Sequence, residues 1–192
     1  MKTNTLKKAY FALIFSAIFG GIATQVGAQE YQILPQSRIG FIGSKFLAVS
    51  VEGSFTRYKG EVAITQGKLE TLKGEIEVDS VESSSETRDK NIRGESLLES
   101  DKFPTINFVM KSYEALESSA QGEVKGKVLG TLTAHGVSKD VALTSTLTPS
   151  KDGYTLRLQG SVNVKKDFKM ESWSVMSNTI EIDVLLVLKP AA

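Results

Sequence analysis

The segment YTLRLQGSVNV, residues 154–164, alternates apolar and polar side chains along its whole length. Leu158 and Val162 belong to the apolar set, whereas Arg157 belongs to the polar set. A period of two residues is that of a β-strand with one buried face and one solvated face. The segment therefore predicts a half-buried strand, and much of the remaining chain repeats its pattern.

Seven further segments have strand character, and short polar turns such as Asp152-Gly153 separate several of them. They cover residues 31–46, 49–64, 72–79, 106–110, 124–134, 141–143 and 179–189. Regularly spaced strands with turn signals are typical of a β-sandwich or an antiparallel barrel. The sequence therefore predicts an all-β fold of about eight strands.

Glycine recurs on the apolar parity of these segments, at Gly74, Gly126, Gly130 and Gly160. Inward glycines permit strong coiling and leave room inside a barrel. Together with the single polar face of each segment, they favour an eight-stranded antiparallel barrel, which is about the size that holds one small ligand. Periodicity alone does not distinguish this hollow barrel from one that large side chains fill.

The segment SETRDKNIRGESLLESDKFPTINF, residues 85–108, interrupts the alternation with a polar, mildly helical run. Pro104 ends that run, because proline does not continue a helix and drives the preceding residue to an extended conformation. Ile106 and Phe108 then resume strand spacing. We expect a short helical insert that crosses a sheet and returns the chain to it.

The first 28 residues have the pattern of a secretory signal peptide. Three lysines precede an apolar core over residues 9–19, and small residues at 26–28 precede Gln29. The apolar core is shorter than the roughly 20 residues that span a bilayer, so we expect no stable membrane anchor. The sequence predicts a cleaved signal peptide over residues 1–28, one exported domain over residues 29–192 and a periplasmic location.

The composition of the chain argues against several functions. Cleavage would remove three lysines and leave 20 basic and 22 acidic residues, a balance that does not suit nucleic-acid binding. The chain has no cysteine and one histidine, His135, which lies in a turn away from any nucleophile motif. The acidic residues of segment 75–82 alternate with apolar ones, as on a solvated strand face. We therefore predict no catalytic residue, no metal site and no cofactor.

Apolar and aromatic residues on the expected strands indicate where a ligand would bind. Ligand pockets are mostly apolar with a few placed polar groups, and ordinary core packing is the alternative for each such residue. Lys45 lies near a strand end, where solvation and contact with an anionic head group are both open. The residues that we expect to contact a ligand are Phe41, Lys45, Phe55, Ile76, Phe108, Leu132, Leu156, Leu158, Val162, Trp173 and Val184.

Seven short segments share their order and spacing with a known family. They are SRIGF at 37–41, GSF at 53–55, GEV at 60–62, RD at 88–89, KFPTINF at 102–108, GTLTAHGVSK at 130–139 and KDFKM at 166–170. This ordered set resembles the YceI-like family of exported proteins. The set covers nearly all of the expected mature chain.

The resemblance implies a lipocalin-like antiparallel barrel with a helical insert and an elongated apolar tunnel. Members of the family are associated with binding polyisoprenoids or other long-chain amphiphiles. Two positions depart from the family pattern: Lys45 stands where many relatives have histidine, and Lys169 where many have glycine. At the first position, a ligand head group would meet a point charge instead of a directional ring.

The sequence and the resemblance lead to one functional hypothesis and two rivals. The first is a periplasmic protein that holds a long-chain isoprenoid or fatty-acyl ligand in its barrel for transport, storage or sequestration. Its main rival is a non-catalytic structural or stress-related interaction module whose barrel is filled. An enzyme that acts on such a lipid with His135 as base ranks last. The oligomeric state, including a homodimer, stays open.

Overall fold

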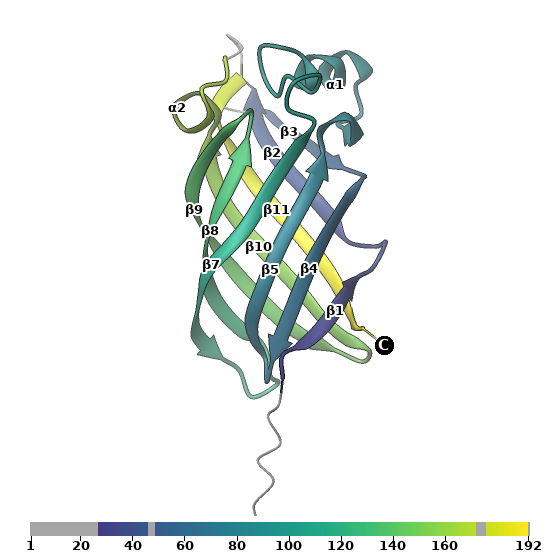
Figure 1. Cartoon of the computed structure of the whole chain (residues 1–192), viewed down its shortest axis with the longest axis vertical. Helices are drawn as coiled ribbons and strands as arrows, with labels where there is room; N and C mark the ends of the chain where they lie inside the picture. Colours follow the sequence, from purple (N-terminus) through teal and green to yellow (C-terminus); the bar gives the residue numbers. More distant parts are fainter. Residues whose placement is uncertain (1–26, 46–48, 172–175, 192) are drawn as a thin grey trace, which may run out of the picture.

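The computed structural model describes residues 27–45, 49–171 and 176–191. Figure 1 shows long strands wound around a common axis, with helices at one end, which we call the upper end. The strands are β1 (Gln29–Ile33), β2 (Arg38–Lys45), β3 (Val49–Phe55), β4 (Tyr58–Thr65), β5 (Lys68–Glu77), β6 (Val81–Glu82), β7 (Thr105–Ser118), β8 (Val124–Ala134), β9 (Val137–Ser150), β10 (Gly153–Asn163) and β11 (Met176–Pro190). The helical elements are the 3-10 turn η1 (Val78–Ser80), α1 (Glu86–Arg93) and α2 (Val164–Phe168). The predicted signal peptide lies almost entirely outside the described residues.

The strands form one antiparallel sheet that closes on itself. Neighbouring strands follow the order β1-β4-β5-β7-β8-β9-β10-β11, and β1 also pairs with β11, which joins the two edges. β2, β3 and β6 continue the sheet from the other part of β11. The described strands therefore form the closed barrel that the sequence predicted.

Three of the eight barrel strands are each built from two of these segments. β1 pairs with β4 and β2 with β3 in one hairpin, in which Tyr31 faces Val62 and Ile39 faces Phe55. β6 continues β5 in the same way, since both pair with the β3–β4 strand. Pro35 lies in the first break and η1 forms the third. The described segments therefore correspond to eight long strands, in agreement with the sequence pattern.

The helical insert lies over the upper end of the barrel rather than across a sheet (Figure 1). α1 begins after Ser85, whose side chain accepts a hydrogen bond from the backbone N–H of Arg88, as an N-cap does. Leu98, which follows α1, is 8% exposed and belongs to the same apolar cluster as Phe168 of α2. The expectation that the insert crosses a sheet was wrong, because its apolar side chains pack at the rim of the closed barrel.

α2 was not predicted, because Val164 continues the alternation of the strand before it. The Asn163 side chain accepts a hydrogen bond from the backbone N–H of Lys166, and Asp167 accepts one from the N–H of Asn163, each at 2.9 Å. These reciprocal bonds satisfy backbone donors and start a helical turn. Lys169 ends the helix with φ 59°, a left-handed conformation that costs a non-glycine residue roughly 1–2 kcal/mol. A glycine, which the resemblance implies at this position in many relatives, would adopt this conformation without that cost.

The lower half of the barrel interior is a close-packed apolar core. Its buried members are Val62, Ile64, Leu69, Leu72, Val128, Leu143, Leu147, Leu156, Leu158, Leu186 and Leu188. Within the described residues, the hydroxyls of Tyr113 and Ser145 are buried without a hydrogen-bond partner. Burial raises the pKa of Tyr113. The buried members of this core are otherwise apolar.

No helix in the described part of the chain is long and apolar enough to cross a membrane.

Candidate functional site

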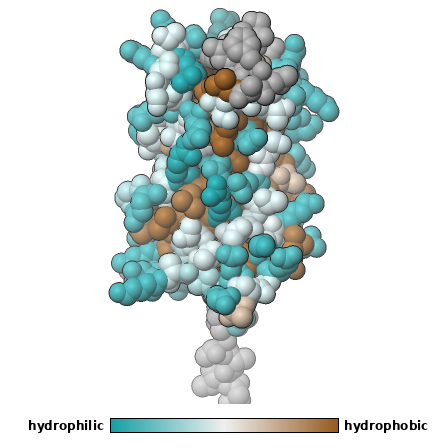
Figure 2. Space-filling view, turned by 180° about the vertical axis from the view of Figure 1, so that it is seen from behind, coloured by the Kyte–Doolittle hydropathy of each residue, from teal (hydrophilic) through white to brown (hydrophobic). Residues whose placement is uncertain are grey.

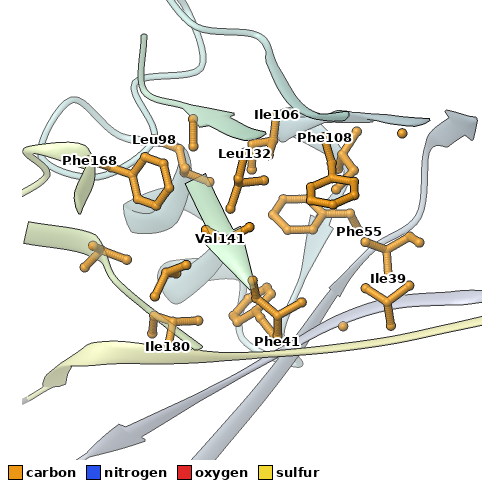
Figure 3. Close-up of a pocket in the computed structure, with 18 of the residues that line it drawn as sticks. Ile39, Phe41, Phe55, Leu98, Ile106, Phe108, Leu132, Val141, Phe168 and Ile180 are labelled. Carbon is orange, nitrogen blue, oxygen red and sulfur yellow. The ribbon is translucent and has the colours of Figure 1, made fainter. Parts of the chain in front are cut away.

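The upper half of the barrel encloses a cavity of about 280 Å³. Side chains from strands around the barrel converge on it, and Leu98 of the insert and Phe168 of α2 complete its lining (Figure 3). Almost all of the surface that faces the cavity is apolar. Small-molecule sites usually measure about 300–1,000 Å³ and are mostly apolar, so this cavity is close to the small end of that class.

Four leucines form the lower boundary of the cavity, and we call them the leucine floor. They are Leu72 on β5, Leu143 on β9, Leu158 on β10 and Leu186 on β11. Each lines the cavity and also belongs to the lower core, and each is at most 4% exposed. The cavity in the upper half of the barrel therefore borders directly on the buried apolar cluster of the lower half.

Gly74 is an inward position on β5 where the missing side chain leaves open space. A Cβ atom at Gly74 would have no other atom within 4 Å, and the backbone there is outside the left-handed region. At the other three predicted inward glycines, a neighbouring side chain occupies the space: Tyr113 at Gly126, Phe108 at Gly130 and Leu143 at Gly160. Those three glycines allow close packing of a neighbour, and of the four Gly74 alone leaves open space.

Charged side chains beside the cavity pair with one another on the outer face of the barrel. Near Gly74, Lys59 Nζ lies 2.9 Å from Glu75 Oε1, and Lys73 Nζ lies 2.6 Å from Glu61 Oε2. The hydrogen bond to Glu75 raises the pKa of Lys59. Figure 2 shows a largely hydrophilic surface with small apolar groups on the face that it presents. The barrel wall thus separates a polar exterior from an apolar interior.

Arg88 is a half-buried basic residue of α1 that contributes to the cavity lining. Its Nε donates a hydrogen bond to Ser83 Oγ at 2.8 Å, and its Nη2 donates to the Ser83 carbonyl oxygen. Ser83 Oγ in turn donates to the Asp89 carboxylate. These bonds tie the start of α1 to the rim of the barrel, which assigns the Arg-Asp pair of the family pattern a structural role.

His135 joins three elements at the rim of the barrel. It forms the two-residue turn after β8 with Gly136, and their φ values of 49° and 70° suit a type I′ hairpin turn. Its Nδ1 lies 3.2 Å from the carbonyl oxygen of Phe168, and its Nε2 lies 3.3 Å from Glu99 Oε2. The Phe103 ring packs edge-on against the imidazole. Both ring nitrogens face protein acceptors. The geometry therefore favours a structural role for His135, holding the turn, the insert and α2 together, over a role as general base.

Eight of the eleven residues expected to contact a ligand line this cavity. They are Phe41, Phe55, Ile76, Phe108, Leu132, Leu158, Val162 and Val184. Leu156 does not line this cavity: it is fully buried in the lower core. The side chain of Lys45 and the whole of Trp173 lie outside the described residues. Contact of the eight with a ligand stays a prediction.

The insert and α2 supply lining residues that the predicted set lacked. They are Ile92, Leu97, Leu98, Val164 and Phe168. The sequence did hold one signal for this cover, the Leu97-Leu98 pair in an otherwise polar run. Two adjacent leucines in such a run indicate contact with an apolar surface. The cavity therefore has both strand walls and a helical cover.

The chemistry available in this site is enclosure and apolar contact. Among the described residues, no three His, Cys, Asp or Glu side chains are grouped as a metal site requires. A ligand with a flexible hydrocarbon portion matches a lining of leucine, isoleucine, valine and phenylalanine, because burial of apolar surface is the main favourable term available there.

A closed antiparallel barrel around an apolar cavity is the architecture of small barrel proteins that enclose one ligand. Residues 31–188 match the YceI-like domain, and the chain belongs to this family. A UPF0312 protein of Pseudomonas fluorescens (strain Pf-5) is 32% identical over 189 residues, which cover 92% of this chain and 94% of that protein. The family predicted from the ordered segments is confirmed.

Solved structures agree with the barrel. The YceI protein of Campylobacter jejuni is 28% identical with a TM-score of 0.61, covering 74% of this chain and 85% of that chain. A polyisoprenoid binding domain from Saccharophagus degradans has a TM-score of 0.65 at 16% identity, covering 85% of this chain and 99% of that chain. The second likeness, at its low identity, supports the fold alone.

Proposed function

We propose that this protein is a periplasmic binding protein that holds the apolar chain of a lipid-like amphiphile, polyisoprenoid or fatty-acyl, for transport, storage or sequestration. The observation that carries the proposal is the cavity of about 280 Å³ with its almost wholly apolar lining. A hydrocarbon chain in the cavity would make dispersion contacts with these side chains. The S. degradans protein that shares this fold is a polyisoprenoid binding domain, and the proposal extends that ligand class to the present cavity.

Burial of the hydrocarbon chain would supply most of the affinity. Each buried methylene contributes about 0.8 kcal/mol, and the cost of ordering the ligand offsets part of the sum. We propose binding without catalysis, because the lining offers hydrocarbon contacts and His135 bonds to the protein itself. The basic, apolar and small-residue pattern of the first 28 residues supports export to the periplasm.

The Val162→Glu variant is expected to weaken the binding of a fluorescent fatty-acyl probe by about tenfold or more. Val162 is half-buried on β10 and lines the cavity. A carboxylate in its place would have to be dehydrated or protonated as the acyl chain enters, and both cost free energy. Titration of probe fluorescence against the purified domain measures the loss.

The matched control is Arg157→Glu on the same strand. Arg157 is exposed and lies on the outer face, where its Nη2 is 2.9 Å from Asp183 Oδ1. Losing an exposed ion pair costs little, so the affinity of this variant for the probe should stay near that of the wild type. Equal losses in the two variants would show that the inner and outer faces of β10 have been assigned wrongly.

A further inference from the structure

Asn178 is a polar residue on the apolar face of β11. It has the parity of Ile180 and Ile182, and all three residues line the cavity. Figure 3 shows Ile180 among the side chains that surround this space. An aliphatic residue at position 178 would continue the apolar lining, whereas the amide of Asn178 interrupts it.

The pairing of β11 is irregular where Asn178 lies. Residues 177–179 stand opposite Ser44 alone, whereas the rest of the pairing between β11 and β2 is regular. Ser177 Oγ accepts a hydrogen bond from the backbone N–H of Thr179 at 3.1 Å, which holds this segment in place. Irregularities of this kind are common next to binding sites, where they change the direction of a side chain. The strand thus departs from regular pairing at the residue that brings an amide to the cavity.

The Oδ1 atom of Asn178 is buried and has no hydrogen-bond partner within the described residues. The hydroxyl oxygens of Tyr113 and Ser145 are in the same state, but neither of those residues lines the cavity. A buried acceptor without a donor costs free energy, and native structures contain few such atoms. The Asn178 oxygen is therefore an acceptor at the cavity that a ligand can satisfy.

The three basic residues described in the lining bond to the protein itself. Nε and Nη2 of Arg88 both donate to Ser83. Lys59 and Lys73 pair with carboxylates on the outer face of the barrel. An anionic head group would have to compete with these partners for a cation, whereas a donor head group would not compete for the Asn178 oxygen.

We propose that Asn178 contacts the head group of the ligand and selects amphiphiles whose head group is an uncharged hydrogen-bond donor, a hydroxyl or an amide. The inference rests on the proposed function, since it concerns the same cavity. A hydroxyl or an amide N–H donates to the Asn178 oxygen, whereas a carboxylate at neutral pH only accepts. The polar end of the ligand would lie near the start of β11, at the upper end of the barrel (Figure 1). Its hydrocarbon portion would follow the apolar lining.

The test compares four ligands that share a ten-carbon chain and differ in the head group: decan-1-ol, decanamide, 1-methoxydecane and decanoate. Dissociation constants at pH 8 come from displacement of the fluorescent fatty-acyl probe, with each ligand below its solubility limit. The ether keeps the oxygen of the alcohol but has no hydrogen to donate. The wild type should bind decan-1-ol more tightly than decanoate.

Two variants on β11 identify Asn178 as the cause. Asn178→Leu removes the acceptor and keeps a side chain of similar size. It should weaken the binding of decan-1-ol and of decanamide by about fivefold or more, the contribution of one hydrogen bond, and change the other two affinities by less than about twofold. Glu181→Leu introduces the same side chain at an exposed position of the strand and should leave all four affinities unchanged. If Asn178→Leu does not fold, Asn178→Ala removes the same acceptor.

The outcomes separate head-group selection from the proposed function. Equal losses for all four ligands in Asn178→Leu would mean that the residue shapes the cavity, and no loss would mean that water or the protein satisfies its oxygen. Either result, or tighter binding of decanoate than of decan-1-ol by the wild type, would overturn the selection and leave lipid binding standing. Failure of all four ligands to bind would overturn both. A loss confined to the alcohol and the amide would establish Asn178 as the head-group contact.

Discussion

Replacing Gly74 with phenylalanine is expected to reduce fatty-acyl binding by at least about fiftyfold while the barrel stays folded. The new side chain would enter the cavity beside Leu72 and Ile76, which share its face of β5 and line the same space. Its seven carbons would occupy space that a bound chain needs. A bound chain that lost the burial of three methylenes, at about 0.8 kcal/mol each, would bind about fiftyfold more weakly.

Gly74→Phe should fold because the position makes no special demand for glycine. A Cβ atom there meets nothing within 4 Å, and the backbone φ is one that other residues adopt. Filling an apolar void also adds dispersion contacts. Probe titration measures the affinity, and circular dichroism with thermal unfolding measures the fold.

The control for this variant is Glu70→Phe, which adds the same ring to the same strand on its exposed face. It should bind the probe like the wild type. A well-folded Gly74→Phe protein whose affinity is within threefold of the wild type would show that the ligand does not occupy this cavity.

The Phe168→Ala substitution is expected to lower the free energy of unfolding by about 3–5 kcal/mol. The Phe168 ring is 1% exposed and is the largest fully buried side chain among the described residues. It packs in the upper apolar cluster with Val78, Val81 and Leu98, which links α2 and the insert to the barrel. A helix of five residues has little stability of its own, so this packing must hold it.

Urea denaturation of Phe168→Ala and of Lys166→Ala measures the difference. Lys166 lies on the same helix and is exposed, so its replacement should change stability by no more than about 0.5 kcal/mol. A loss below about 1 kcal/mol for Phe168→Ala would mean that α2 does not anchor the cover of the cavity.

The strands could be predicted from the sequence because alternation reports directly which face of a strand is buried. β8 and β10 were predicted to within one residue at each end. Alternation could not predict α2, whose first residue has the parity of a strand. That helix depends on the local bonds of Asn163 and Asp167, which override the pattern.

The candidate site could be predicted only in part, because parity gives the face of a residue and not its height in the barrel. Leu156 and Leu158 have the same parity on β10, yet Leu158 borders the cavity and Leu156 is packed beneath it. Gly74 and Gly130 likewise share an inward parity, but the Phe108 ring covers only the second. Height depends on strand stagger and on cross-strand neighbours, which a single sequence does not display.

The most direct test of the central claim is native mass spectrometry of the protein purified from the periplasm of its own cells, followed by solvent extraction and lipid analysis. We expect a mature chain that begins at Gln29 and carries one equivalent of an amphiphile with an apolar chain. An unliganded mass, together with no uptake of added decanoic acid or of a longer isoprenoid or fatty acid, would contradict ligand binding. It would favour a structural module that acts through its outer surface.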